Sequence, residues 1–423
     1  MATGEITKNT KGLLYLTVLI YPLWSFYLSF KYFRMPQAKN LFWLFCIFLG
    51  MVHIYFPEGE SSSDGVRYAQ QLIDLHQQPV PFENFTSLFY EDGQFVDIYQ
   101  PIVTYLLSTV TDNPRWLFLI FAVVFGFFYS RNSWFVLERF PKTVAFPLFL
   151  LSFYYILICP VWEINGVRTW TALHVFVYGA LPYLYNSDKS KLIWCGASCL
   201  FHFSFFLPVT VLLMYHFIPK SINYLLAFFL ISLFIKEIDL EQIRSFILTY
   251  APSFIHNRAD MYANEDYAQT INDLKSNLNF YMEGSKMFVQ WVAAILLFVS
   301  GVWGKKIVET NRSLKNLLCF SLFIYAISNI LSLIPSFGRF IVLSQSFAFA
   351  SLIFFYISYK QSQFINKTIA VSFKMIPLLL FLPIIVKLRF GSDFYGISLL
   401  FNPIAALFVD DNQPFIHYIK SIF

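Results

Sequence analysis

The sequence predicts an all-α fold, a polytopic integral membrane bundle of about 10–12 transmembrane helices with two extracytoplasmic loops. Hydrophobic residues make up 57% of the 423 residues and charged residues 13%, which is about half the charged share of a soluble domain. Uncharged apolar runs recur along the chain, and roughly 17 to 25 such residues cross the hydrocarbon of a bilayer. We expect one polytopic domain over residues 1–423, with outer loops at 57–114 and 236–286.

Ten apolar runs are predicted to span the membrane: Gly12–Phe30, Leu41–Phe56, Trp116–Leu137, Thr143–Trp162, Thr169–Ser187, Ser221–Ile235, Met287–Gly304, Asn316–Gly338, Phe340–Tyr359 and Thr368–Val386. A further run, Leu192–Pro219, is too long for one helix, short for two, and interrupted by Pro208. Proline in a membrane helix often marks a break beside a cavity. We therefore expect Leu192–Pro219 to form a broken hairpin that enters and leaves by the same face.

Lysine and arginine in the short loops set the orientation, because positively charged loops stay cytoplasmic. The basic loops contain Lys31/Arg34/Lys39, Arg131/Arg139/Lys142, Lys189/Lys191, Lys305/Lys306/Arg312/Lys315 and Lys360/Lys367. The loop 57–114 instead carries nine acidic residues against Arg67 alone, so we place it outside. The net charge of +5 follows from the basic loops and does not indicate a nucleic-acid partner. The first apolar run lacks a cleavage site and is interpreted as a signal anchor.

Five cysteines lie in apolar runs, and Cys195 and Cys199 share a helix face. Neither has a His or carboxylate at ligand spacing, so we interpret them as small packing residues. No metal site and no cofactor is predicted.

The first polar motif at a span end contains Asp64, Arg67 and Tyr68. Asp64 fits either the N-cap of an interfacial helix or a carboxylate that takes a proton from a sugar hydroxyl. Arg67 lies one turn later, where it can form a local salt bridge with Asp64. The spacing of Val66, Ala69 and Ile73 indicates that the loop is partly helical.

The second motif is the short turn with Glu163, Asn165 and Arg168. An arginine at a helix start opposes the helix dipole, so an anionic partner is expected there. That partner is either Glu163 or a phosphate, whose oxygens the planar guanidinium matches.

Two further motifs complete the set. His202 lies among phenylalanines and needs partners for its ring nitrogens, either in a packed hydrogen-bonded site or as a proton acceptor. Arg339 begins a late span after Gly338, where it serves as a headgroup anchor or binds an anionic substrate. Arg389 lies beside Asp393 at the end of a less well-defined run.

These motifs, in this order, resemble the EpsG-like branch of the Wzy-type polysaccharide polymerases. The resemblance rests on Asp64 to Tyr68, Asn165 to Arg168, His202 to Ser204, and Arg339, and it covers about Gly12 to Tyr359. Two positions depart from the family pattern. Thr169 follows Arg168 where a Gln is frequent, and Phe203 stands where a Lys is common, which puts a charged role for His202 in doubt.

The resemblance implies a GT-C-like, metal-independent glycosyltransferase that joins undecaprenyl-pyrophosphate-linked oligosaccharide repeat units at the outer face of a bacterial inner membrane. Its partners would be those lipid-linked sugars, membrane lipids, a chain-length regulator and a flippase. The site residues it implies are Asp64, His202 and Glu163 for catalysis, Arg168, Arg339 and Arg67 for pyrophosphate, and Tyr68 and Asn165 for sugar. We expect Asp64, at the water-facing edge, to be the base rather than His202.

Two alternatives use the same residues differently. An oligosaccharide ligase or another lipid-linked-sugar glycosyltransferase needs the same arginines and carboxylates. A polysaccharide flippase is the non-enzyme alternative, although transporters tend to hold their charges near the midplane between symmetric halves.

Overall fold

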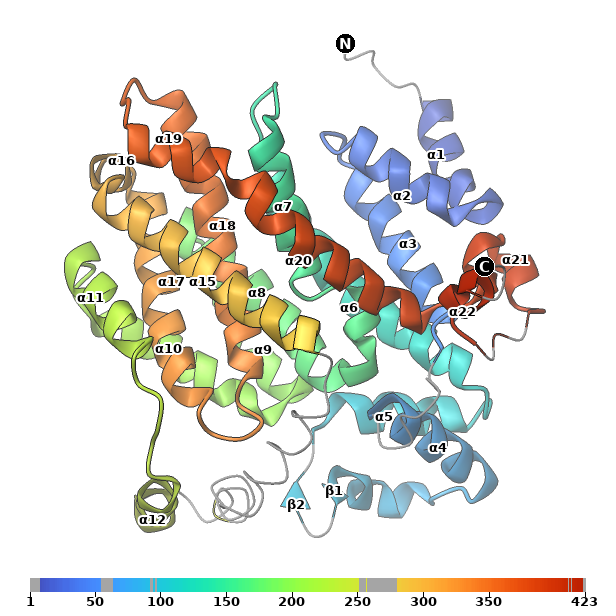
Figure 1. Cartoon of the computed structure of the whole chain (residues 1–423). Helices are drawn as coiled ribbons and strands as arrows, with labels where there is room; N and C mark the ends of the chain where they lie inside the picture. Colours follow the sequence, from blue (N-terminus) through green and yellow to red (C-terminus); the bar gives the residue numbers. More distant parts are fainter. Residues whose placement is uncertain are drawn as a thin grey trace.

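The computed structural model describes residues 8–54, 64–91, 94–95, 97–250, 256, 280–409, 411 and 413–420. Within these ranges the regular structure is almost entirely helical. Two strands of two residues each form one antiparallel hairpin. Figure 1 shows the long helices packed into a bundle, with the hairpin, α4 and α5 gathered at one end. The predicted all-α membrane bundle is confirmed.

The elements up to the first long helices are α1 (Lys8–Ile20), α2 (Pro22–Lys31), α3 (Ala38–Met51), α4 (Asp64–Gln77), the 3-10 helix η1 (Phe82–Phe89), β1 (Tyr90–Glu91), β2 (Gln94–Phe95), α5 (Tyr99–Ser108), α6 (Pro114–Leu137) and α7 (Phe146–Leu157). The middle of the chain forms η2 (Val161–Gly166), α8 (Val167–Asn186), η3 (Lys189–Lys191), α9 (Leu192–Phe201), η4 (Phe203–Phe205), α10 (Phe206–Phe217), α11 (Ile222–Ser232) and α12 (Leu240–Tyr250). The last part forms α15 (Phe280–Val302), α16 (Lys305–Thr310), α17 (Arg312–Leu331), α18 (Arg339–Gln361), α19 (Lys367–Lys374), α20 (Ile376–Gly391), η5 (Ser392–Phe394), η6 (Ile397–Leu400), α21 (Pro403–Ala406) and α22 (Phe415–Lys420).

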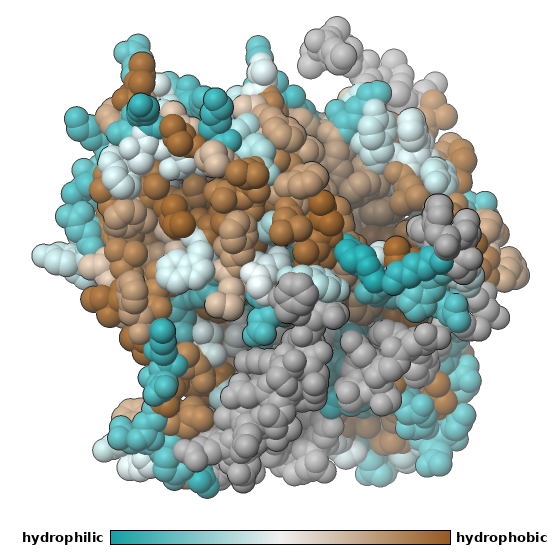
Figure 2. All heavy atoms as spheres, viewed as in Figure 1, coloured by the Kyte–Doolittle hydropathy of each residue, from teal (hydrophilic) through white to brown (hydrophobic). Residues whose placement is uncertain are grey.

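Six helical segments of the described chain are long and apolar enough to cross a membrane: Pro114–Leu137, Phe146–Asn186, Tyr281–Val302, Arg312–Leu331, Arg339–Gln361 and Lys367–Phe394. Three shorter apolar helices accompany them, over Ala38–Met51, Phe203–Phe217 and Ile222–Ser232. Figure 2 shows apolar side chains across the face that α20 and α15 present, with polar ones gathered along its upper edge. An apolar band of this kind is what a helical bundle presents to lipid.

Several of the ten predicted spans have the wrong extent. Leu41–Phe56 is helical only as far as Met51, and Thr368–Val386 is divided between α19 and α20. Gly12–Phe30 is divided into α1 and α2 at Pro22, because proline has no N–H for the helix and clashes with the preceding turn. Thr143–Trp162 is helical only over α7, and a 3-10 turn follows Pro160. Asn316–Gly338 ends as a helix at Leu331, since a proline at 335 disfavours helix before it.

Small residues allow the central helices to approach closely. A Cβ on Gly50 of α3 would lie 2.3 Å from Ala122 Cβ of α6, and one on Gly126 of α6 would lie 2.7 Å from Cys46 Cβ of α3. Membrane helices associate largely through such close packing of small side chains. The cysteines in the described ranges are all free, consistent with the predicted packing role.

The basic loops meet at one end of the bundle. Arg34 donates a 2.6 Å hydrogen bond to the carbonyl of Pro141. Asn316, near the start of α17, donates to the carbonyl of Leu184 near the end of α8 and accepts from Tyr215 near the end of α10. Because α9 begins directly after α8 and η3, the α9–α10 segment leaves this end and returns to it. This geometry agrees with the predicted broken hairpin.

The described part of the predicted first outer loop, 57–114, folds onto the opposite end of the bundle. The helix predicted from the spacing of Val66, Ala69 and Ile73 is confirmed as α4. One face of α4 is buried and contains Tyr68, Ala69, Leu72 and Leu75. The second outer loop, 236–286, lies partly outside the described residues, which there include α12 and the start of α15.

Candidate active site

Four segments far apart in the sequence meet at the end of the bundle that faces α4 and α5. They are the position two residues before α5, the start of α8, the break between α9 and η4, and the start of α18. Together with α4 they contribute Tyr68, Asp97, Arg168, His202 and Arg339, which we call the Asp97 cluster. A helix of 23 residues such as α18 is roughly 35 Å long at 1.5 Å per residue, so Arg339 lies far from the basic end.

Asp97 is the centre of the cluster, and its side chain is only 2% exposed. Oδ1 accepts a 2.6 Å hydrogen bond from the backbone N–H of Phe203, and Nδ1 of His202 lies 3.5 Å from the same oxygen. Oδ2 lies 3.5 Å from a guanidinium nitrogen of Arg168. Burial works to raise the pKa of Asp97, but His202, Arg168 and the Phe203 N–H together hold that pKa below its usual value. Asp97 is therefore an anion at neutral pH and loses its charge only as the pH falls through the lowered pKa.

His202 lies between a carboxylate and a guanidinium. Its Nε2 is 2.8 Å from a guanidinium nitrogen of Arg339. Arginine only donates hydrogen bonds, so this contact assigns Nε2 as an acceptor and places the ring proton on Nδ1, toward Asp97. The backbone N–H of Ser204 points at Nδ1 from 3.4 Å, but a nitrogen that carries the proton cannot accept it, so this long contact is not a hydrogen bond in the tautomer that Arg339 and Asp97 favour. The arrangement orients a neutral imidazole with its basic nitrogen toward Arg339.

The two arginines begin neighbouring helices. Arg168 donates from Nε to the hydroxyl of Tyr68 over 3.0 Å, and its side chain is 19% exposed. Arg339 donates from Nε to the carbonyl of Ser336 over 2.7 Å and from a terminal nitrogen to Oγ1 of Thr169 over 3.2 Å. Ser336 has a positive φ of 67°, which belongs to the tight turn that holds the carbonyl there. Thr169 thus links the start of α8 to the start of α18.

Asp64 and Arg67 pair with each other, as the local salt-bridge interpretation expected. Their side chains are 41% and 52% exposed, so this pair lies at the surface beside the cluster. Gly65 follows, and a Cβ there would lie 1.9 Å from Oδ1 of Asn165. Only glycine allows α4 to approach the turn before α8 this closely.

Glu163 pairs with a residue outside the cluster. Its ion pair, at 3.9 Å, is with Lys387 of α20, and Lys387 also donates to the carbonyl of Ile158. Arg389 pairs with Asp393 one turn along the chain. The structure thus brings Tyr68, Arg168, His202 and Arg339 together from the predicted residues, and leaves Glu163 and Arg389 in pairs of their own.

One cluster residue, Asp97, and one partner of the cluster, Thr169, were missed from the sequence. Asp97 was counted only as one of the acidic residues of the outer loop, because no motif distinguishes it from its neighbours. Thr169 was noted only as a departure from the family pattern. A weak signal was present: Asp97 stands directly before an apolar segment that becomes α5, a position where an unpaired carboxylate is costly.

Three buried polar atoms close to the cluster along the chain have no hydrogen-bond partner: Oδ1 of Asn165, the hydroxyl of Tyr99 and Oγ of Ser204. Buried polar groups are nearly always satisfied, and a polar ligand is one explanation for such exceptions. Within the described ranges, no three His, Cys, Asp or Glu side chains are grouped to hold a metal ion.

Comparison with known proteins gives one match. The EpsG family profile matches residues 81–409, a range that holds Asp97, Arg168, His202 and Arg339 and begins after Tyr68. Neither the search of curated proteins nor the search of solved structures found a match. The matched range covers well over half of the 423 residues, and the chain therefore belongs to the EpsG family, whose members have a polysaccharide polymerase-like role.

Proposed function

We propose that this protein polymerises undecaprenyl-pyrophosphate-linked oligosaccharide repeat units into a surface polysaccharide at the outer face of a bacterial inner membrane. One observation carries the proposal most directly. Two guanidinium groups, of Arg168 and Arg339, converge beside a paired Asp97 and His202 at one end of a membrane bundle. Glycosyl transfer from a lipid pyrophosphate needs cations for the leaving group and a base for the acceptor.

The arginines suit the leaving group. Asp97 balances one of the two guanidinium charges in the cluster, so a net positive charge remains for an anionic substrate. Both side chains are held in place, Arg168 by Tyr68 and Arg339 by Ser336 and Thr169. Preorganised positive charge at the point where negative charge develops stabilises a transition state without reorganisation.

His202 suits the acceptor. Asp97 orients the ring through Nδ1, which leaves the basic lone pair of Nε2 toward Arg339. When a pyrophosphate oxygen replaces Nε2 as the acceptor of the Arg339 guanidinium nitrogen, Nε2 becomes available to a hydroxyl. A His–carboxylate pair of this kind contributes as a general base with the carboxylate holding the tautomer.

In the proposed reaction, the acceptor oxygen forms a bond to the anomeric carbon of the donor as the bond from that carbon to the pyrophosphate oxygen breaks. The bonding electrons leave with undecaprenyl pyrophosphate, held by Arg168 and Arg339. The hydroxyl proton passes to Nε2 of His202. In this reaction Asp64 does not take the proton. It pairs with Arg67 at the surface beside the Asp97 cluster and holds the Arg67 side chain in place.

The surface glycan of a deletion strain tests the proposal against its rivals. Loss of polymerase activity leaves a product with one repeat unit on the surface. A ligase would instead leave the final acceptor unmodified, and a flippase would leave repeat units in the inner leaflet. Complementation with the wild-type chain restores long polymer in the first case. Either of the other two patterns contradicts the proposal.

A further inference from the structure

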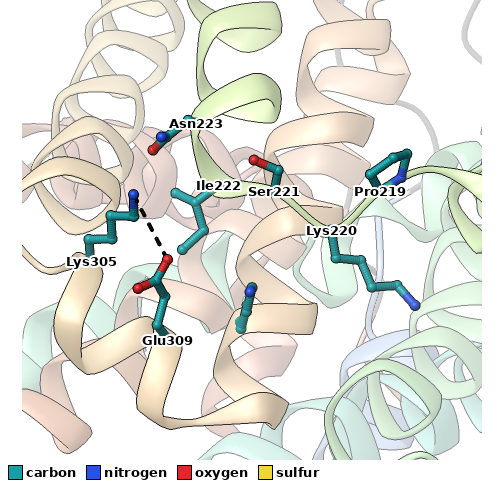
Figure 3. Close-up of a pocket in the computed structure, with 8 residues that line it drawn as sticks. Pro219, Lys220, Ser221, Ile222, Asn223, Lys305 and Glu309 are labelled. Carbon is teal, nitrogen blue, oxygen red and sulfur yellow. Dashed lines mark ion pairs between the residues drawn. The ribbon is translucent and has the colours of Figure 1, made fainter.

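A second charged hollow lies at the opposite end of the bundle from the Asp97 cluster. It has a volume of about 290 Å³ and is lined by residues from the α10–α11 connection, the start of α11, α16 and α17: Pro219, Lys220, Ser221, Ile222, Asn223, Lys305, Glu309 and Lys315. Figure 3 shows Lys305 and Glu309, one turn apart on α16, pointing toward one another at the wall of this hollow. Nothing in the glycosyl transfer proposed above uses this hollow.

We propose that this hollow binds the phosphate-bearing headgroup of an anionic phospholipid in the leaflet at the basic end. Its charge is the first argument. Lys220, Lys305 and Lys315 come from three different segments, while Glu309 is the one carboxylate in the lining. Because the ammonium of Lys220 lies at the rim over Tyr215, Lys305 and Lys315 against Glu309 leave one positive charge uncompensated inside the hollow.

The placement of these ammonium groups supports an anionic ligand. Lys305 lies 3.9 Å from Glu309, a loose pair, and Lys305 and Lys315 are both half-buried rather than extended into solvent. Lys220 lies at the rim, where its ammonium stacks 5.5 Å from the ring centroid of Tyr215, and Figure 3 shows its side chain running away from Lys305. The need for positive loops explains lysines at this end of the bundle, but it does not require them to surround a hollow.

The beginning of α11 adds backbone donors to the same lining. Ser221 is the N-cap, and its side chain makes no cap hydrogen bond. The first N–H groups of a helix have no partner within it and attract anions.

The neighbouring surface distinguishes a lipid from a free phosphate. Phe217 is 82% exposed and Tyr224 77% exposed, and they stand two residues before and one after the lining of the α10–α11 connection. Trp303, 40% exposed, precedes Lys305 by two residues. Aromatic side chains of this kind lie at the level of the headgroups, beside the acyl chains. A phospholipid would use both the lysines and these aromatic groups, whereas inorganic phosphate would use the lysines alone.

Lipid titration of the purified full-length protein in a neutral detergent tests this inference, which does not depend on the proposed glycosyl transfer. We expect phosphatidylglycerol to raise the Tm more than phosphatidylcholine does, and inorganic phosphate at the same concentration to leave it unchanged. Replacing two lysines, Lys305→Gln with Lys315→Gln, should weaken phosphatidylglycerol binding roughly thirtyfold, since each lysine near a lipid surface contributes about a fivefold factor.

The control is the pair Lys189→Gln with Lys360→Gln, which removes the same charge from exposed positions at the same end and outside the lining. It should bind phosphatidylglycerol within about twofold of the wild type, a small effect because exposed distant charges are screened. The variant with Lys305→Arg and Lys315→Arg keeps both positive charges, so it should bind phosphatidylglycerol as the wild type does. This result would show that the glutamine variant loses binding through lost charge and not through misfolding. Unchanged binding in the glutamine variant overturns the inference, and so does an equal Tm shift with inorganic phosphate.

Discussion

Nε2 of His202 and a terminal guanidinium nitrogen of Arg339 lie 2.8 Å apart, so the proposed base and a proposed pyrophosphate ligand share one hydrogen bond. The same imidazole faces Asp97 through Nδ1. Binding of pyrophosphate to Arg339 would therefore release the lone pair of His202 as the donor substrate arrives. Such coupling delays proton removal until both substrates are present.

His202→Gln should abolish long polymer at normal expression. Glutamine replaces hydrogen bonds of a neutral imidazole but has no basic nitrogen, and loss of a general base costs on the order of 10²- to 10⁴-fold in rate. Chain length on gels of the surface glycan measures the effect. His216→Gln, at the exposed end of α10, is the matched control and should leave polymer unchanged.

Asp64→Asn should retain measurable polymer, because the structure pairs Asp64 with Arg67 at the surface and the amide oxygen of asparagine can still accept a hydrogen bond from Arg67. From the sequence we expected Asp64 to be the base, and the structure instead favours His202 for that role. A dead Asp64→Asn variant beside an active His202→Gln variant would return the base to Asp64.

Asp97→Asn should also remove long polymer while the protein still accumulates in the membrane. The amide keeps the shape of the side chain but can neither hold the tautomer of the His202 ring nor balance the charge of Arg168. Loss of such a carboxylate lowers the catalytic rate on the order of 100-fold or more. Asp112→Asn changes an exposed acid of the same outer loop and should have no effect. Polymer of normal length from Asp97→Asn would remove Asp97 from the site.

The convergence of His202, Arg168 and Arg339 was foreseeable because each is costly where it stands. A histidine among phenylalanines and an arginine at a helix start both require partners, and span ends on one face bring such residues together. The long helices α6, α8, α15 and α18 were equally predictable, since each is an apolar run long enough to cross a bilayer.

Asp97 was not foreseeable in the same way. It contacts Phe203 across 106 residues of the chain, and no local pattern encodes which acid of a loop folds into the bundle. The division of the first span at Pro22 does not follow from the length or hydropathy of the run, because membrane helices also tolerate proline when neighbours satisfy the freed carbonyl. Helix lengths such as that of α7 likewise depend on tertiary packing.

Arg168→Lys and Arg339→Lys should each abolish chain growth without reducing the amount of protein in the membrane. Arg168 contacts both Tyr68 and Asp97, and a single ammonium cannot reproduce the planar fork that also matches phosphate. Arg312→Lys, exposed at the basic end, is the control. Long polymer in both site variants would reduce these arginines to headgroup anchors.

Topology is the last prediction, and it decides which compartment the Asp97 cluster faces. The basic loops at one end of the bundle should be cytoplasmic, since positively charged short loops resist translocation. A reporter active only outside the cytoplasm should therefore be active when fused after Glu91, which lies in the loop that folds over the cluster. The same reporter should be silent after Lys189 or Arg312, at the opposite end. Lys189 is the more discriminating position because it immediately precedes α9, whose partner α10 returns to the same end. Activity there with silence at Arg312 would show that the α9–α10 segment crosses the membrane once, and the hairpin that places His202 beside Arg339 would have to be abandoned.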